Sequence, residues 1–198
     1  MLPYLYIIFY FWRYIMQIQT LLNSLESTIY EGILKLDGCA DSSMSIYYDL
    51  DLINYLLSTS FSSNEECFHQ ITSSFKKLGK ENQILVTSQN NRFQFTVTKD
   101  GISHICKSYE NKPFLKELIA LTKNRNFTLE QVETLFSTYS SNYIHKTFNH
   151  PEFQHIFSFL DTSLDPYIYC FSFDEMGSYF HRLLPYHFEE LLKESHSH

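Results

Sequence analysis

Nine histidines are the residues in this 198-residue sequence that most suggest metal chemistry. His145, His150 and His155 recur every five residues, and His181 and His187 are six residues apart. Two metal ligands on one face of a helix need a spacing of four residues, as in HExxH, and no pair of histidines has it. His155 and His181 could still meet across neighbouring strands, but half-exposed strand histidines explain the same pattern. The sequence therefore predicts no metal site.

The sequence also lacks the patterns of other catalytic sites. Its five glycines are not clustered, so they cannot form a phosphate-binding loop, and no serine has a GxSxG setting. The carboxylate pairs Asp49/Asp51 and Glu189/Glu190 are interpreted as a helix cap and a solvated helix face. We therefore predict no catalytic residue and no cofactor, and we favour a protein that is not an enzyme.

An enzyme with an unrecognised site remains an alternative. Its site would have to be assembled from residues that are far apart in the sequence, and the pocket candidates are Tyr48, His181 and Arg182. If these three side chains converge in one buried pocket, that arrangement would favour an enzyme.

Basic residues are concentrated between Lys76 and Lys99, where five Lys or Arg residues accompany one acid. A predicted helix over residues 65–78, followed by a two-stranded ribbon, resembles the last helix and wing of a winged-helix domain. The residues that would face phosphates are Lys76, Lys77, Lys80 and Arg92. The net charge of −7 and the acids Glu65 and Glu66 at the start of this helix oppose DNA binding. A DNA-binding regulator is therefore the alternative function, and not the leading one.

The elements around these residues belong to a globular protein, because 44% of the residues are hydrophobic and 19% are charged. Apolar periodicity predicts an amphipathic helix over residues 16–36, and Asp49 can cap a short helix after a strand at 45–48. A hairpin is predicted to pair residues 84–87 with 93–97, followed by a turn at 99–101 that leads into residues 102–106. Pro113 opens a further helix, and Thr128 with Gln131 forms a capping box for the next one.

Strong aromatic alternation marks the last fifty residues. Apolar and aromatic side chains alternate over 153–159, 167–173 and 178–183, with turns between these runs, which is typical of an antiparallel meander. We therefore predict an α+β protein with N-terminal helices and a β-hairpin, then two helices and a C-terminal antiparallel β-meander. One domain over 16–195 is expected, divided at most into two subdomains that meet near 107–112.

Residues 1–15 form a separate hydrophobic extension. An apolar run of this length is too short to span a membrane, and the charge of Arg13 follows the run, unlike in a secretory signal. The segment is either an interfacial membrane anchor or an over-extended start preceding a natural start at Met16, which we favour. A chain that begins at Met16 is then expected to fold. The four cysteines form no CxxC pair, so we expect reduced thiols and a cytoplasmic protein, with peripheral membrane attachment through residues 1–15 as the alternative.

Three short segments carry a resemblance to a family. The sequences SIYYDL at 45–50, FLKEL at 114–118 and YFHR at 179–182 resemble a bacterial family of unknown function whose members are about 180 residues long. The resemblance covers residues 16–192, and it implies an uncharacterised protein without any functional residue to transfer. We therefore predict a non-catalytic cytosolic interaction protein with a protein partner. DNA is a less favoured partner, and membrane contact is expected only through residues 1–15.

Overall fold

The computed structural model describes the backbone of residues 2–38, 42–89 and 92–195, and the side chains of residues 17–193 outside these gaps. Its contacts divide the chain into two compact units, residues 1–111 and residues 112–198. We call them unit 1 and unit 2 and describe each by itself.

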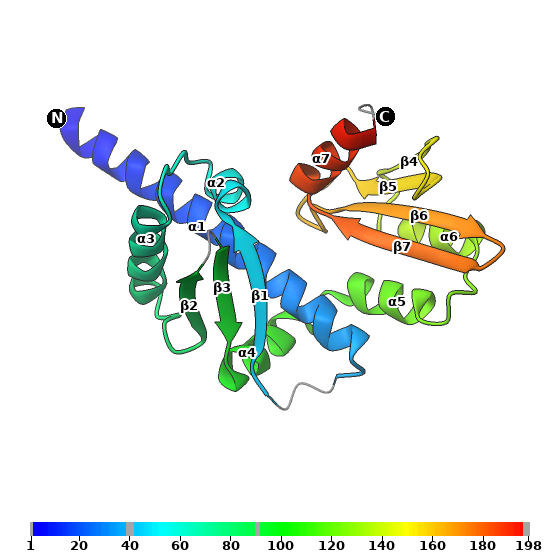
Figure 1. Cartoon of the computed structure of the whole chain (residues 1–198), viewed down its shortest axis with the longest axis horizontal. Coiled ribbons are helices and arrows are strands. Elements are labelled where there is room, and N and C mark those ends of the chain that lie inside the picture. Colours follow the sequence, from blue (N-terminus) through cyan, green and yellow to red (C-terminus); the bar gives the residue numbers. More distant parts are fainter. Residues whose placement is uncertain (1, 39–41, 90–91, 196–198) are drawn as a thin grey trace. The chain divides into compact units, whose positions relative to one another are not determined.

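Unit 1 is a three-stranded antiparallel sheet with four helices (Figure 1). Its elements are α1 (Leu2–Lys35), β1 (Met44–Asp49), α2 (Leu50–Leu57), α3 (Asn64–Lys77), β2 (Ile84–Gln89), β3 (Arg92–Val97) and α4 (Lys99–Tyr109). The predicted hairpin of β2 and β3 is confirmed, and β1 adds a third strand on the other side of β3, which gives the order β1-β3-β2. The first helix is longer than the predicted range, because it begins at Leu2.

The core of unit 1 contains the apolar face of α1 and the buried face of β3. The predicted apolar stripe of α1 is buried, with Ile18, Leu21, Leu22, Leu25, Ile29 and Ile33 at 4% exposure or less. In β3, every second residue (Phe93, Phe95, Val97) is fully buried, because alternate side chains of a strand point to opposite faces. Both patterns could be read locally in the sequence, which is why these predictions agree with the structure.

The segment after β3 differs from its prediction. The turn expected at residues 99–101 is instead the first turn of α4, because the Thr98 hydroxyl accepts a hydrogen bond from the Gly101 N–H at 3.3 Å and caps the helix. A glycine is needed at this point, since a Cβ on Gly101 would lie 2.5 Å from the carbonyl oxygen of Gln83. The sequence KDG at 99–101 is typical of a turn, but the helix cap provided by Thr98 makes it the first turn of α4.

Unit 2 is a four-stranded antiparallel meander with helices on both faces. Its elements are α5 (Pro113–Thr122), α6 (Leu129–Tyr139), β4 (Tyr143–Thr147), β5 (His155–Phe159), β6 (Ile168–Asp174), β7 (Gly177–Leu183) and α7 (Pro185–Ser195), and the strand order is β4-β5-β6-β7. The α+β class and the C-terminal meander are confirmed, as is the capping box of Thr128 and Gln131. The first strand, β4, was not predicted.

The two faces of this meander have different cores. On one face, Phe114 of α5 and Phe136 of α6 pack edge-on or tilted against the aromatic rings of Phe159 and Tyr169. On the other face, a smaller cluster is formed by buried Phe153, Ile156 and Cys170, with partly buried Phe188 and Leu191 of α7 packed against it. Because both faces are covered, each strand must carry apolar residues on both sides.

Candidate functional site

The exposed side of α3 is the first candidate surface. Ser63 caps α3, and the helix buries Cys67, Ile71 and Phe75. The opposite side is exposed and carries acids at its start and bases at its end, namely Glu65, Glu66, Lys76 and Lys77. The side chains of Lys76 and Lys77 have no hydrogen bond or ion pair with any residue that the structure describes. They are therefore available for a binding partner.

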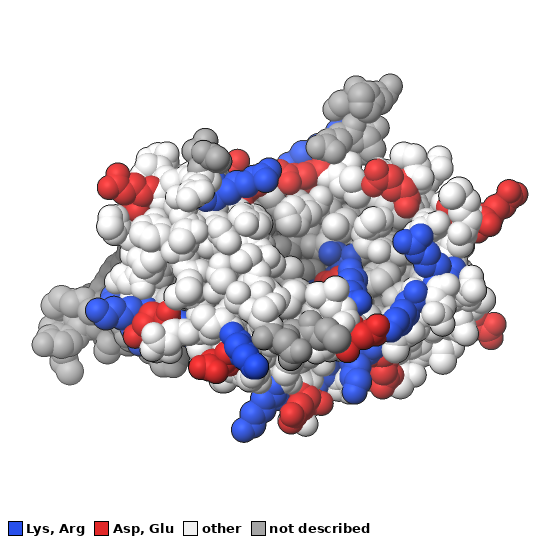
Figure 2. All heavy atoms as spheres, turned by 60° about the horizontal axis from the view of Figure 1, so that its bottom comes forward, with Lys and Arg blue, Asp and Glu red and all other residues white. Residues whose placement is uncertain are grey.

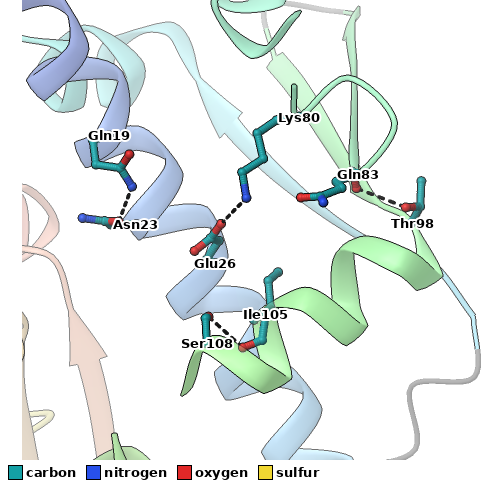
Figure 3. A network of polar contacts seen from close by, with 8 residues as sticks. All are labelled: Gln19, Asn23, Glu26, Lys80, Gln83, Thr98, Ile105 and Ser108. Atoms are coloured by element: carbon teal, nitrogen blue, oxygen red, sulfur yellow. Dashed lines mark hydrogen bonds and ion pairs between the residues drawn. The ribbon is translucent and has the colours of Figure 1, made fainter. Parts of the chain in front are cut away.

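The other two predicted phosphate contacts are less available. Lys80 is half buried, and its Nζ lies 3.3 Å from Oε1 of Glu26 on α1, as Figure 3 shows. Arg92 is exposed at the start of β3, but it lies opposite Asp49 in the register of β1 and β3. The negative charges of Glu26 and Asp49 reduce the positive potential that a phosphate would meet here. On the face of the molecule drawn in Figure 2, Lys and Arg side chains are interspersed with Asp and Glu.

A buried charged cluster lies in unit 2 on the aromatic face of the meander. The Arg182 side chain is only 1% exposed, and its Nη2 donates a hydrogen bond to Oδ2 of Asp165 at 2.8 Å. Its Nε donates to the Tyr169 hydroxyl at 3.0 Å, and its guanidinium stacks 3.4 Å from the ring centre of Tyr167. Burial, and then the charge of Asp165, raise the pKa of Tyr169 well above its ordinary value. All of these contacts hold Arg182 inside the fold, so we assign this cluster a structural role.

A chain of three titratable side chains lies at the β4–β5 side of the same sheet. Nδ1 of His145 is 3.0 Å from Oε1 of Glu133 on α6, and Nε2 of His145 is 3.0 Å from Nδ1 of His155. When His145 is neutral and donates to Glu133, its Nε2 must accept a hydrogen bond from His155. Burial lowers the pKa of His155, and the neighbouring His145 lowers it further, while Glu133 opposes the shift. His145 also stacks on the ring of Phe157 at 4.2 Å, which fixes its orientation.

A pocket of about 270 Å³ lies on the opposite face of the meander, between β7 and α7. Its apolar floor is formed by Phe153, Cys170, Leu183 and Leu191. Its polar lining consists of two carboxylates and two imidazoles, those of Glu152, His181, His187 and Glu190. Burial raises the pKa of the Cys170 thiol to about 12, so this group stays protonated at neutral pH.

The three pocket candidates of the enzyme alternative have different surroundings. Tyr48 belongs to unit 1, where its hydroxyl lies 2.9 Å from the Ser24 hydroxyl on α1. His181 and Arg182 are successive residues of β7 and therefore point to opposite faces of the meander. His181 lines the pocket, whereas Arg182 is bound to Asp165 on the other face.

The residues that the structure describes contain neither a cluster of metal ligands nor a helix able to cross a membrane. Within the described residues, no group of three or more His, Cys, Asp or Glu side chains is arranged to hold a metal ion. None of the helices in that part combines the length and the apolar character that crossing a membrane requires. His155 lies against His145 and not against His181, because the register pairs His155 with Phe171 and His181 with Cys170, which point to opposite faces of the sheet.

Comparison with known protein families gives a match over most of the chain. The family described as a domain of unknown function from an E. rectale gene, DUF3877, matches residues 18–192. The chain belongs to this family. The sequence-based resemblance to an uncharacterised bacterial family is thereby confirmed, over nearly the same range. No curated protein and no solved structure matches the chain.

Sequence reasoning missed most of the pocket. Of its polar lining, only His181 was a candidate, and Glu190 was assigned to a solvated helix face. The signal that could have identified the pocket is weak: Glu152, His181 and Glu190 are far apart in the sequence and share no motif. Their proximity depends on the pairing of β6 with β7 and on the position of α7.

Proposed function

We propose that this protein is a non-catalytic interaction protein of the cytoplasm and that the exposed side of α3 binds a protein partner. The observation that carries the proposal is the charge arrangement on this helix. Glu65 and Glu66 make its first turn negative, and Lys76 and Lys77 make its last turn positive. A surface with both signs of charge complements a protein that presents the opposite order, and it complements a uniformly negative polymer less well. The same order of charges also stabilises α3 through the helix dipole, so a test must separate binding from stability.

Two further observations support the proposal. Unit 1 places α3 directly before a two-stranded ribbon, as a winged-helix domain does, and one side of this helix stays exposed to a partner. Cys67, Cys106 and Cys170 are free thiols in the described part of the chain, as is usual for proteins of a reducing compartment.

A photo-crosslinking experiment in the native cell tests this proposal. A crosslinking amino acid at Ser73, on the exposed side of α3, is expected to capture a protein that mass spectrometry identifies. The matched control is the same amino acid at Ser103, which is exposed on α4. Capture of the same protein from both positions, or from neither, would contradict a binding surface on α3.

A DNA-binding regulator is the second candidate, because Lys76, Lys77 and Arg92 are all exposed beside the ribbon of the winged-helix-like unit. Charge reversals distinguish the two functions. The double variant Glu65→Lys/Glu66→Lys should strengthen binding to a DNA duplex, since it removes repulsion from phosphates, but it should weaken binding to the crosslinked protein. The double variant Lys76→Glu/Lys77→Glu should weaken both.

The measurement is fluorescence anisotropy with a labelled duplex at several salt concentrations, with thermal unfolding as the control for stability. DNA binding through a few phosphates would appear as an affinity that falls steeply with salt. An affinity for duplex DNA that Glu65→Lys/Glu66→Lys raises and Lys76→Glu/Lys77→Glu abolishes would replace the protein partner with DNA.

A further inference from the structure

The pocket between β7 and α7 has charged groups that the fold itself does not use. The carboxylates of Glu152 and Glu190 and the imidazole of His181 have no hydrogen bond or ion pair with any residue that the structure describes. Arg182 on the other face of the meander is, by contrast, paired with Asp165. Unpaired charges around a concave apolar surface are a feature of binding sites more than of structural ones.

The floor of the pocket is apolar and chemically inert. Phe153 is 1% exposed and Cys170 is fully buried, and both belong to the cluster on which Phe188 and Leu191 of α7 pack. The Cys170 thiol stays protonated because burial raises its pKa, so it contributes neither a nucleophile nor a thiolate ligand. The apolar contact that a ligand would meet therefore comes mainly from the partly exposed Leu183 and Leu191, and the floor contributes no reaction.

Two carboxylates are the acidic groups that line the pocket. Glu152 precedes β5 and Glu190 lies on α7, so the two carboxylates come from different elements, and no Lys or Arg lines the pocket. The nearest cation along β7, Arg182, points to the opposite face and is held by Asp165. A bound cation would therefore meet two carboxylates that have no competing partner.

We propose that this pocket binds a small organic cation: a protonated amine or a guanidinium on an apolar body. The cationic end is held by Glu152 and Glu190, and the apolar body rests on Phe153, Leu183 and Leu191. The volume of about 270 Å³ corresponds to roughly nine water molecules, which sets the size of the ligand near that of 2-phenylethylamine. This inference concerns unit 2 alone and does not depend on the function proposed for α3.

A metal ion is a poorer fit to the same residues. The pocket contains His181, His187 and two carboxylates, but no three of the potential ligands in the described chain are grouped as a metal requires. The one soft ligand, Cys170, is protonated. The pocket therefore contains side chains of the types that bind metal ions, but they are not grouped as a metal ion requires.

Three probes with the same apolar body test the proposal on the full chain. We expect 2-phenylethylamine to bind at least about tenfold more tightly than the neutral 2-phenylethanol, because charge-assisted hydrogen bonds are stronger than neutral ones. The anion 3-phenylpropionate should not bind. Isothermal titration gives the affinities, and methyl NMR signals locate the site: those of Leu183 and Leu191 should shift, while that of Ile144 on β4 should not.

Variants of the two glutamates then test whether their carboxylates hold the cationic end of the ligand. Glu152→Gln and Glu190→Gln should each weaken amine binding about tenfold. The matched control, Glu189→Gln on the same helix, should have no effect, because Glu189 does not line the pocket. All three residues are exposed, so these variants are expected to fold, which thermal unfolding checks.

Several results would overturn the proposal. The proposal would be wrong if the amine and the alcohol bound with equal affinity, or if none of the probes bound. It would also be wrong if the two Glu variants bound the amine as tightly as the unaltered chain does. Binding of Zn²⁺ or Ni²⁺ that displaces the amine and is lost in His181→Gln and His187→Gln would replace the organic cation with a metal ion.

Discussion

The cores of the two units differ in the polar groups that they bury. Unit 1 has a core of mainly aliphatic helix residues together with sheet residues such as Phe93 and Phe95, and its charged contact between Lys80 and Glu26 is only partly buried. Unit 2 has an aromatic core that encloses a guanidinium, a carboxylate and two phenol rings around Arg182. The difference indicates that unit 1 is stabilised mainly by buried apolar area, whereas in unit 2 the removal of one member of a buried pair would leave the charge of its partner uncompensated.

The largest effect is expected from breaking the buried pair of unit 2. In Asp165→Ala, the side chain of Arg182 keeps its charge but loses its counter-ion, which should cost about 3–5 kcal/mol of the free energy of unfolding. Urea unfolding followed by circular dichroism measures this change. The matched control is Asp161→Ala, since Asp161 is exposed in the turn between β5 and β6. A loss below about 1 kcal/mol for Asp165→Ala would mean that the pair does not support unit 2.

The double variant Asp165→Leu/Arg182→Met sharpens the same test. Replacing a buried ion pair by apolar residues is often neutral or stabilising, so this variant should recover most of the stability that Asp165→Ala loses. If it remains as unstable as Asp165→Ala, the hydrogen bond of Arg182 to Tyr169 and its stacking on Tyr167 matter more than its charge.

A somewhat smaller effect is expected from truncating the aliphatic core of unit 1. Leu25 is fully buried on α1, and Leu25→Ala should cost about 2–5 kcal/mol through lost burial and a residual cavity. Hydrogen exchange should show the loss in residues 17–111 and leave unit 2 protected. Leu36→Ala is the control, because Leu36 is 56% exposed and should change stability little. An equal loss of protection in unit 2 would show that the two units unfold together.

A polar deletion in unit 1 should cost less than the deletion at Asp165 in unit 2. Tyr48→Phe removes the hydroxyl that lies 2.9 Å from the Ser24 hydroxyl, and we expect a loss of about 1 kcal/mol. The neighbouring Tyr47→Phe is the matched control, because Tyr47 is 59% exposed and points to the other face of the sheet. Thermal unfolding of the two variants measures the difference. If Tyr48→Phe costs as much as Asp165→Ala, the contrast between the units is wrong.

The smallest effect is a pH dependence that arises in unit 2. The pKa of His155 is lowered in the folded chain, mainly by burial, so the unfolded chain binds more protons near pH 6.5. This contribution to stability is complete above pH 6.5 and is lost as the pH falls through the lowered pKa. Chemical unfolding between pH 7.5 and pH 5 should therefore show a decline that His155→Gln reduces. His104→Gln is the control, because His104 is exposed on α4 in unit 1.

Several parts of the fold followed from local sequence signals alone. The apolar stripe of α1, the hairpin of β2 and β3, the caps at Asp49 and Thr128 and the strands β5 to β7 were all predicted. Each of these signals spans only a few residues, because helix periodicity, strand alternation and capping are properties of neighbouring residues. The same signals misassigned residues 99–101, where a turn sequence follows a helix cap.

Other features were decided only by tertiary structure. The pairing of β1 with β3 joins Met44 to Val97, and the buried contact of Arg182 with Asp165 joins positions on either side of β6. The pocket likewise brings Glu152 to Glu190. No local pattern encodes such contacts, because they depend on how whole strands and helices pack. By itself, the sequence therefore determined most of the elements of this protein and their apolar faces, while packing decided which charges are buried in pairs and which are left to bind a ligand.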